Sequence, residues 1–175
     1  MARTIKRMTT SQIITDTVLG HDIVAVARIH RFFERFGERG LKRLFSQDEI
    51  MASYRGKNAV DRAFDAAVVQ RLAGRFAVKE AVAKALGVGF KGLGCQRNPA
   101  TSSPVTSSKS AFKRASWLEI TLHSDGQSAP SIKLTGNAAA VAREKNISQW
   151  RVSHAHDGDM ASATVLGLVF LQEKA

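Results

Sequence analysis

The sequence holds a single cysteine, Cys95, among its 175 residues. No disulfide can therefore form within the chain, and no C-x-x-C pair is present to hold a structural zinc ion. This cysteine usage fits a reducing compartment, and we expect a cytoplasmic protein. Apolar runs long enough to span a bilayer are also lacking, because Ser162 and Thr164 interrupt even the most apolar stretch, residues 161–171. We therefore expect no membrane partner.

Acidic and aromatic residues are scarce as well. The 15 Asp and Glu stand against 26 Lys and Arg, which gives a formal net charge of +11. A field of this sign attracts nucleic acid, anionic lipid, phosphorylated small molecules or acidic proteins. With aromatics at 7%, no strand shows the basic–aromatic pattern of an RNA-binding platform. We expect no nucleic-acid partner, and the cluster of Lys109, Lys113 and Arg114 leaves a basic nucleic-acid-binding module as an alternative.

The length suits one domain with a hydrophobic core. Residues 1–16 are polar and basic, as is typical of a flexible amino-terminal extension, and they lack the apolar segment of a secretory signal. Residues 17–175 are predicted to form the single domain. Within it, residues 96–116 are rich in serine and indicate a loop insertion.

The order of the predicted elements indicates an α+β fold, with an antiparallel sheet packed against a long central helix. A strand is expected from Thr17, followed by a helix that Gly37 and Gly40 end. The apolar stripe of that helix is formed by Ile29, Phe32, Phe33 and Phe36. A short helix is expected to begin with a capping box formed by Ser46 and Glu49. The remaining elements are a long helix over 61–86 stopped by Gly87, paired strands over 117–123 and 131–134, a helix over 137–145, and strands over 147–153 and 161–171.

Two carboxylates stand in settings that suit a metal ion. Asp22 is expected just after a strand, where a metal-binding carboxylate is common, although a turn aspartate that caps the next helix would look the same. Glu80 and Lys84 share one face of the long helix, where they could also form an ordinary solvent-facing ion pair with no ligand. Small neighbours such as Ala77 and Ala81 let backbone or a ligand approach closely, and a carboxylate there needs a cation.

His154 and His156 form a third candidate, since both would point to one face of a strand. They could bind a transition metal, but no third nitrogen or sulfur ligand lies nearby to complete a zinc site. His156 could instead donate to a phosphate beside the Gly158 turn. In the structural alternative, His154 is a partly buried strand residue and His156 an exposed turn residue.

Taken together, these segments resemble the holo-acyl-carrier-protein synthases, the short, trimeric 4'-phosphopantetheinyl transferases. The shared motifs are Gly-x-Asp-Ile-Val at 20–24, Gly-Arg-Phe-Ala-x-Lys-Glu-Ala-x-x-Lys-Ala-Leu-Gly at 74–87, and Ser-x-x-His-Asp-Gly-Asp-x-Ala-x-Ala at 153–163. The resemblance implies a 4'-phosphopantetheinyl transferase-like fold. It also implies transfer of 4'-phosphopantetheine from coenzyme A to a serine of apo-acyl carrier protein, with release of 3',5'-ADP, in fatty acid biosynthesis.

The resemblance further implies roles for individual residues. Asp22 and Glu80 would bind Mg²⁺ and, with Lys84, form the catalytic group. Positions near the coenzyme A phosphates would be Arg75, Lys79, Lys84 and His156. Arg28 would meet the acidic carrier protein, and Arg31 and Arg35 extend the same basic face. A homotrimer is also implied, with active sites at subunit interfaces, and the Asp22 motif and the Lys84 helix must meet within one chain or between neighbouring chains.

Three positions depart from the family pattern. His21 and His154 stand where apolar residues are usual, and Ala155 replaces a common Ser or Thr. These departures leave a catalytically silent paralogue as an alternative. The motifs also do not separate acyl carrier protein from the carrier domain of a polyketide or peptide synthase as the acceptor.

Overall fold

The computed structural model describes residues 13–55, 65–87, 116–124 and 128–171. Its elements, in chain order, are β1 (Ile14–Ala25), α1 (Val26–Leu44), α2 (Gln47–Tyr54), α3 (Ala66–Leu86), the 3-10 helix η2 (Trp117–Glu119), β2 (Ile120–His123), β3 (Ser131–Leu134), α4 (Gly136–Glu144), β4 (Ile147–Asp157) and β5 (Met160–Phe170). The predicted α+β class is confirmed. Residues 1–12 of the predicted extension and residues 96–115 of the predicted insertion lie outside the described residues.

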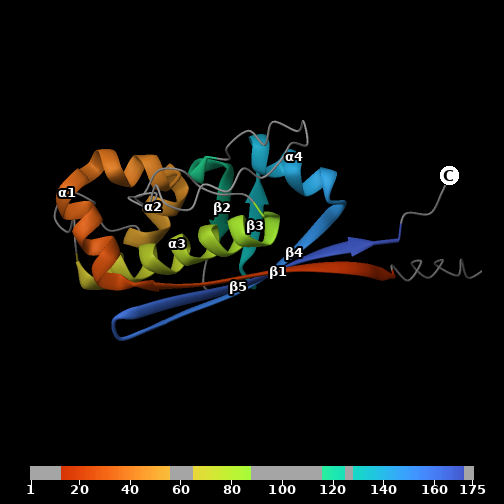
Figure 1. Ribbon diagram of the computed structural model, residues 1–175. Coiled ribbons are helices and arrows are strands. Elements are labelled where there is room, and N and C mark those ends of the chain that lie inside the picture. Colours follow the sequence, from red (N-terminus) through yellow and green to blue (C-terminus); the bar gives the residue numbers. More distant parts are fainter. Residues whose placement is uncertain (1–12, 56–64, 88–115, 125–127, 172–175) are drawn as a thin grey trace, which may run out of the picture.

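The strands form two antiparallel sheets, one of order β1-β5-β4 and one of β2-β3. All described helices lie on one side of the three-stranded sheet, with α3 directly against it (Figure 1). On the other face, Leu19 and Ile23 of β1 are 66% and 55% exposed, and no element within the described ranges covers them. Among the described helices, none combines the length and the apolar character that crossing a bilayer requires.

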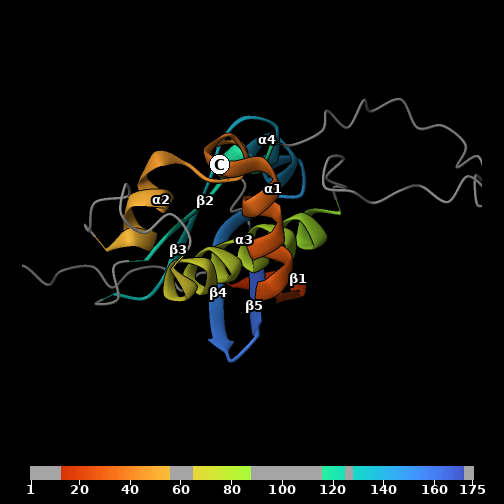
Figure 2. The ribbon, with the colours of Figure 1, turned by 90° about the vertical axis from the view of Figure 1, so that its left-hand side faces the viewer.

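Helix α3 is the centre of the core. Its side chains are buried on nearly every face, because the sheet lies on one side of it and α1, α2 and β2 on the other (Figure 2). The Asp65 carboxylate accepts a hydrogen bond from the Ala67 amide at 3.1 Å and caps the amino terminus. Gly87, at φ 68°, ends the helix as predicted.

Several element boundaries differ from the predictions. Strand β1 begins at Ile14, so residues 14–16 pair with β5 instead of belonging to the extension. Helix α1 runs on to Leu44 with a kink at Gly37, whose φ of 55° and ψ of −147° only glycine adopts readily. Phe36, expected in the apolar stripe, is 48% exposed beside this kink. The chain therefore bends at Gly37, where an end of the helix was predicted.

Two elements in the second half of the chain also differ from the predictions. Residues 117–119 form a 3-10 helix instead of a strand, because the Ser116 side chain caps the turn by accepting from the Leu118 amide at 3.3 Å. Strand β4 continues to Asp157, so both His154 and His156 lie within the strand and the tight turn follows at Gly158. The β2–β3 hairpin and the capping box at Ser46 are confirmed.

Candidate active site

Strand β1 lies against α3 because Gly20 has no side chain. A Cβ atom at Gly20 would collide with the carbonyl oxygen of Ala81 and lie 2.9 Å from the Ala85 nitrogen. The small residues of α3 therefore admit another backbone, as their spacing suggested. Asp22 follows two residues later on the same face of β1, which brings its carboxylate to the turns of α3 that carry Glu80 and Lys84.

Lys84 and Asp22 meet directly within one chain. The Lys84 ammonium donates to Asp22 Oδ1 at 2.7 Å and to the carbonyl oxygen of His21 at 2.9 Å. The side chain of Lys84 is 55% exposed and that of Asp22 only 14%. Asp22 thus lies inside a strand and is no helix-capping turn residue. Of the two arrangements that the sequence left open, the structure shows Asp22 and Lys84 in contact within a single chain.

Glu80 completes a compact group of charges. Burial raises the pKa of the Glu80 carboxyl, and the Asp22 carboxylate nearby raises it further, while Arg28 and Lys84 act in the opposite direction. A carboxyl group whose ionisation a neighbouring carboxylate disfavours is a natural ligand for a divalent cation, which would relieve the repulsion. Lys84 forms its ion pair with Asp22, so the alternative of an isolated Glu80–Lys84 ion pair on a solvated helix face does not hold.

The donor set decides which metal would suit this group. Within the described ranges, no cluster of three or more His, Cys, Asp or Glu side chains converges on one point. A zinc site or a transition-metal site at His154 and His156 therefore lacks ligands here. Mg²⁺ prefers hard oxygen ligands and commonly uses one or two carboxylates together with water and substrate phosphate. Asp22 and Glu80 fit that requirement.

The two histidines of β4 lie apart from this group in the sheet. His154 is opposite Ala163, which is opposite Asp22, so a whole strand separates them. Within the described residues, the buried Nδ1 atom of His154 has no hydrogen-bond partner, and a Cβ atom at Gly74 would lie 3.4 Å from it. Burial lowers the pKa of His154, and Arg75 and His156 lower it further. His154 is thus a half-buried neutral strand residue.

His156 is exposed and stands opposite Ala161, which pairs with Val24. Because β5 separates β4 from β1, two strand spacings, about 10 Å, lie between the backbones of His156 and β1. Nothing among the described contacts joins His156 to Asp22, Glu80 or Lys84 within the chain. Its predicted place at the coenzyme A phosphates is therefore not reproduced by one chain alone.

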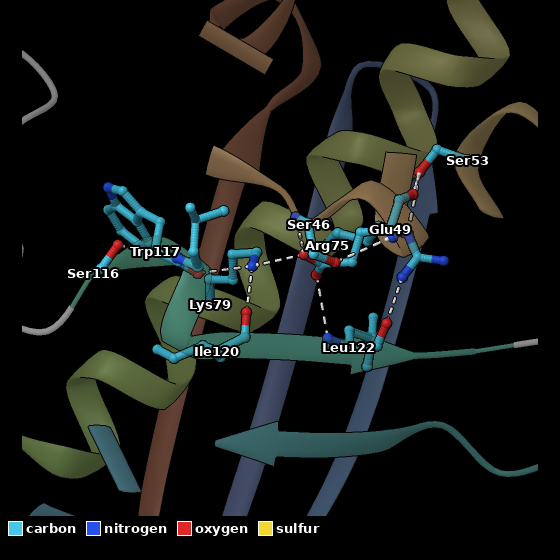
Figure 3. Close-up of polar contacts among 10 residues, drawn as sticks. Ser46, Glu49, Ser53, Arg75, Lys79, Ser116, Trp117, Ile120 and Leu122 are labelled. Carbon is cyan, nitrogen blue, oxygen red and sulfur yellow. Dashed lines mark hydrogen bonds and ion pairs between the residues drawn. The ribbon is translucent and has the colours of Figure 1, made fainter. Parts of the chain in front are cut away.

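Arg75 and Lys79 lie on another side of α3, in the core (Figure 3). Lys79 is fully buried, and its ammonium donates to the carbonyl oxygens of Trp117 and Ile120 and to Glu49 Oε2. The three donors of a lysine are thereby used. Arg75 donates to Ser53 Oγ at 3.1 Å and to the Leu122 carbonyl oxygen at 2.7 Å.

The predicted place of Arg75 and Lys79 at the coenzyme A phosphates is therefore not reproduced by one chain alone. Lys79 is fully buried and has no donor left to offer a phosphate, and Arg75 directs its Nε and Nη1 atoms into the core. The motif places both residues correctly on α3, but its spacing alone does not reveal which side of a helix faces the substrate.

The three predicted docking arginines lie on α1 and are exposed. The guanidinium of Arg28 lies 5.8 Å from the ring centroid of Phe76, and its charge lowers the pKa of Glu80. Arg35 lies 5.2 Å from the ring centroid of Phe36, its exposed neighbour. The basic face of α1 therefore borders the Asp22–Glu80–Lys84 group at Arg28.

Two residues that matter for the site had no assigned role at the sequence level. Gly20 appeared only as the first residue of a shared motif, although a glycine opposite a run of alanines is a signal for close packing. Glu49 was read only as part of a capping box, which it does form with Ser46. Its ion pair with Lys79 spans thirty residues of sequence and leaves no local pattern.

Comparison with known proteins agrees with the fold. A family model described as the 4'-phosphopantetheinyl transferase superfamily matches residues 18–165. The chain belongs to this superfamily. It is 36% identical to the holo-[acyl-carrier-protein] synthase of Herpetosiphon aurantiacus over 86% of this chain and 98% of that protein. It is 34% identical to the corresponding protein of Chloroflexus aurantiacus over 84% of this chain and 94% of that one.

Solved structures show the same fold. The Helicobacter pylori holo-[acyl-carrier-protein] synthase in complex with coenzyme A is 28% identical, with a TM-score of 0.56 over 87% of this chain and 99% of that one. The Plasmodium yoelii acyl carrier protein synthase with ADP bound gives a TM-score of 0.62 at 23% identity, over 91% of this chain and 98% of that one. These comparisons confirm the predicted family, the fold class and the enzyme class, a phosphopantetheinyl transferase.

Proposed function

We propose that this chain is a holo-[acyl-carrier-protein] synthase that transfers 4'-phosphopantetheine from coenzyme A to a serine of an acyl carrier protein. The products are holo-carrier protein and 3',5'-ADP, and the reaction serves fatty acid biosynthesis in the cytoplasm. The observation that carries the proposal is the meeting of Asp22, Glu80 and Lys84 in one chain, beside the basic face of α1. The relatives named above support the substrates.

The reaction is attack by a serine hydroxyl on the β-phosphorus of the coenzyme A pyrophosphate. Its barrier comes largely from negative charge on the reacting phosphates, so positioned cations are the main catalytic tool. Mg²⁺ held by Asp22 and Glu80 would supply charge neutralisation at the pyrophosphate. Lys84, whose side chain is 55% exposed beside Asp22, can donate to a pyrophosphate oxygen. The serine proton passes to Glu80 or to a water held beside Asp22.

The basic face of α1 would guide the carrier protein to this site. Acyl carrier proteins are acidic, and the exposed Arg28, Arg31 and Arg35 offer complementary charge. Arg28 is the arginine nearest the reaction, since its charge acts on Glu80. Docking there would bring the acceptor serine close to the pyrophosphate.

A homotrimer would complete the coenzyme A site. The exposed Leu19 and Ile23 on the uncovered face of β1 suit contact with another copy of the chain. His156, exposed on β4 and remote from β1 in its own chain, could then serve the Asp22 site of a neighbouring subunit. Its imidazole would donate a hydrogen bond to a coenzyme A phosphate.

Mass spectrometry of apo-acyl carrier protein tests the proposal. Incubation with coenzyme A, Mg²⁺ and this protein is expected to add about 340 Da to the carrier protein, the mass of phosphopantetheine transferred in this group-transfer reaction. Omitting Mg²⁺ or adding a chelator is expected to stop the transfer. Absence of the mass shift with acyl carrier protein, but its presence with a polyketide or peptide synthase carrier domain, would reassign the acceptor. No shift with any carrier would refute the function.

A further inference from the structure

The buried ion pair between Lys79 and Glu49 joins three elements at one point (Figure 3). The Lys79 ammonium donates from α3 to Glu49 Oε2 on α2 at 2.9 Å and to the carbonyl oxygen of Trp117 in η2 at 2.9 Å. The carboxylate of Glu49 accepts in addition from the amides of Ser46 at 3.0 Å and Leu122 at 3.2 Å. Neither charged group is exposed to solvent.

These side chains occupy the free edge of β2. That strand pairs with β3 on its other side. On the edge facing α3, the carbonyl oxygens of Ile120 and Leu122 accept from Lys79 and Arg75, and the Leu122 amide donates to Glu49. Side chains of two helices thus substitute for a neighbouring strand, and they fix β2 and η2 against α3.

Stability alone does not account for such a pair. Replacing a buried ion pair with neutral residues of similar volume is often neutral or stabilising, because charges are costly to remove from water. The benefit of a buried pair is more often a single defined arrangement of the elements that it joins. Lys79 immediately precedes Glu80 on α3, so fixing one side chain constrains the direction of the other.

We propose that Lys79 and Glu49 are positioning residues that fix the rotation of α3 about its own axis and thereby aim Glu80 and Lys84 at Asp22. Rotating a helix by roughly 10° moves a side-chain end, roughly 6 Å from the axis, by about 1 Å. A misplacement of that size can cost about 10²-fold in rate. The kinetic part of this inference rests on the proposed function, and the geometric part does not.

The test is the double variant Lys79→Met/Glu49→Gln, which removes both charges and keeps one amide oxygen to accept from one of the two amides that Glu49 binds through its separate oxygens. Single variants would leave one buried charge alone and risk misfolding. We expect the double variant to fold, with kcat at least about tenfold lower, half-maximal activity at about tenfold higher Mg²⁺, and KM for coenzyme A within about threefold of wild type. A general loss of folded protein would lower the apparent kcat without moving the Mg²⁺ dependence.

Crystal structures of the wild type and the double variant give a readout that needs no activity. The Glu80 carboxylate is expected to move by about 1 Å or more relative to Asp22. Arg71→Leu is the matched control, because Arg71 also ties α3 to α2, through the Ser53 carbonyl oxygen at 2.6 Å, but two turns away from Glu80. It should leave the Glu80 position, kcat and Mg²⁺ dependence unchanged.

An unmoved Glu80, or a kcat and Mg²⁺ dependence equal to those of the wild type, would overturn the positioning role. If the double variant does not fold, the pair is a structural requirement, and the positioning role is likewise rejected. A wild type without transferase activity would count against the proposed function alone, since the two crystal structures would still decide the geometry.

Discussion

The two sides of α3 that carry charged residues differ in whether protein groups or solvent surround those charges. On the side toward α2 and β2, Arg75 and Lys79 are buried, and protein oxygens take up their donors. On the side toward β1, Glu80 is half-buried and Lys84 is exposed, and they share their surroundings with Asp22 and Arg28. Both sets come from one fourteen-residue motif. The first set stabilises an arrangement, whereas the second remains accessible for a metal ion and a phosphate.

A charged residue within a motif therefore does not by itself indicate a ligand. Burial lowers the pKa of the Lys79 ammonium, and the charge of Glu49 counteracts that effect. The charge of Lys79 is therefore balanced by a residue of the same chain. The raised pKa of Glu80 reflects the opposite situation, in which burial and the Asp22 carboxylate act together. The accessible side of α3 is therefore where substitutions should affect chemistry more than folding.

Neutralising either carboxylate is expected to have the largest effect. Asp22→Asn and Glu80→Gln should each lower kcat by about 10²–10³-fold. Each variant loses a carboxylate that would hold Mg²⁺, so the negative charge of the reacting phosphates would no longer be neutralised by a fixed cation. Steady-state transfer assays and thermal unfolding measure the two effects separately. Glu38→Gln is the control, since Glu38 forms an exposed ion pair with Lys42 far from the site. Normal turnover in Asp22→Asn would remove Asp22 from the metal site.

Gly20→Ala sharpens the comparison from the side of β1. The added methyl group would collide with the backbone of α3, so β1 must shift and carry Asp22 away from Glu80 and Lys84. We expect a loss of activity of about 10²-fold and a destabilisation of about 1–3 kcal/mol. Chemical denaturation and transfer assays check both. The control is Ser148→Ala, at an exposed position of β4, which should change neither the activity nor the stability. Wild-type activity and stability in Gly20→Ala would show that the close approach of β1 to α3 is dispensable.

Reversing the charge of Arg28 tests whether the basic face of α1 binds the carrier protein. Arg28→Glu should raise the KM for acyl carrier protein about tenfold and weaken its salt dependence, with coenzyme A binding nearly unchanged. Arg143→Glu, at an exposed position of α4, is the matched control. Equal losses for coenzyme A and carrier protein would argue that Arg28 acts at the phosphates instead of at the docking face.

His154 provides the smallest expected effect, on the pH dependence of stability. Burial, Arg75 and His156 lower its pKa in the folded chain below the ordinary 6.5, so the unfolded chain binds the proton more readily. The free energy of unfolding should therefore fall as the pH drops through 6.5 toward the lowered pKa. Solvent reaches part of the ring, so the loss should be well under the roughly 1.4 kcal/mol per pH unit that one proton can contribute.

Urea denaturation at pH 7.5 and pH 5.5 measures this dependence. His154→Phe should lose part of the acid-side destabilisation, whereas the exposed control His123→Gln should keep it. An acid-side slope that is identical in wild type and His154→Phe would contradict the assignment of His154 as a buried neutral residue.

Much of this molecule follows from local patterns. Gly87 and the Ser46 capping box were predictable because the signals for helix ends lie within a few residues. The motifs also singled out Asp22 and Glu80, and in the structure the Asp22 carboxylate acts on the pKa of Glu80. The opposite environments of Lys79 and Glu80 were not, because adjacent helical residues point about 100° apart and only the neighbouring elements decide which is buried. Strand β1 was misjudged at Ile14 because its partner, β5, lies at the other end of the chain.

We propose that Asp22 and Glu80 together hold a divalent cation against the coenzyme A pyrophosphate. Mn²⁺ accepts the same oxygen ligands as Mg²⁺ and can be counted directly by electron paramagnetic resonance. A titration of the wild type in the presence of coenzyme A should show one bound Mn²⁺ per site, with affinity at least about tenfold weaker in Asp22→Asn and in Glu80→Gln. Equal Mn²⁺ affinity in all three proteins would contradict the account.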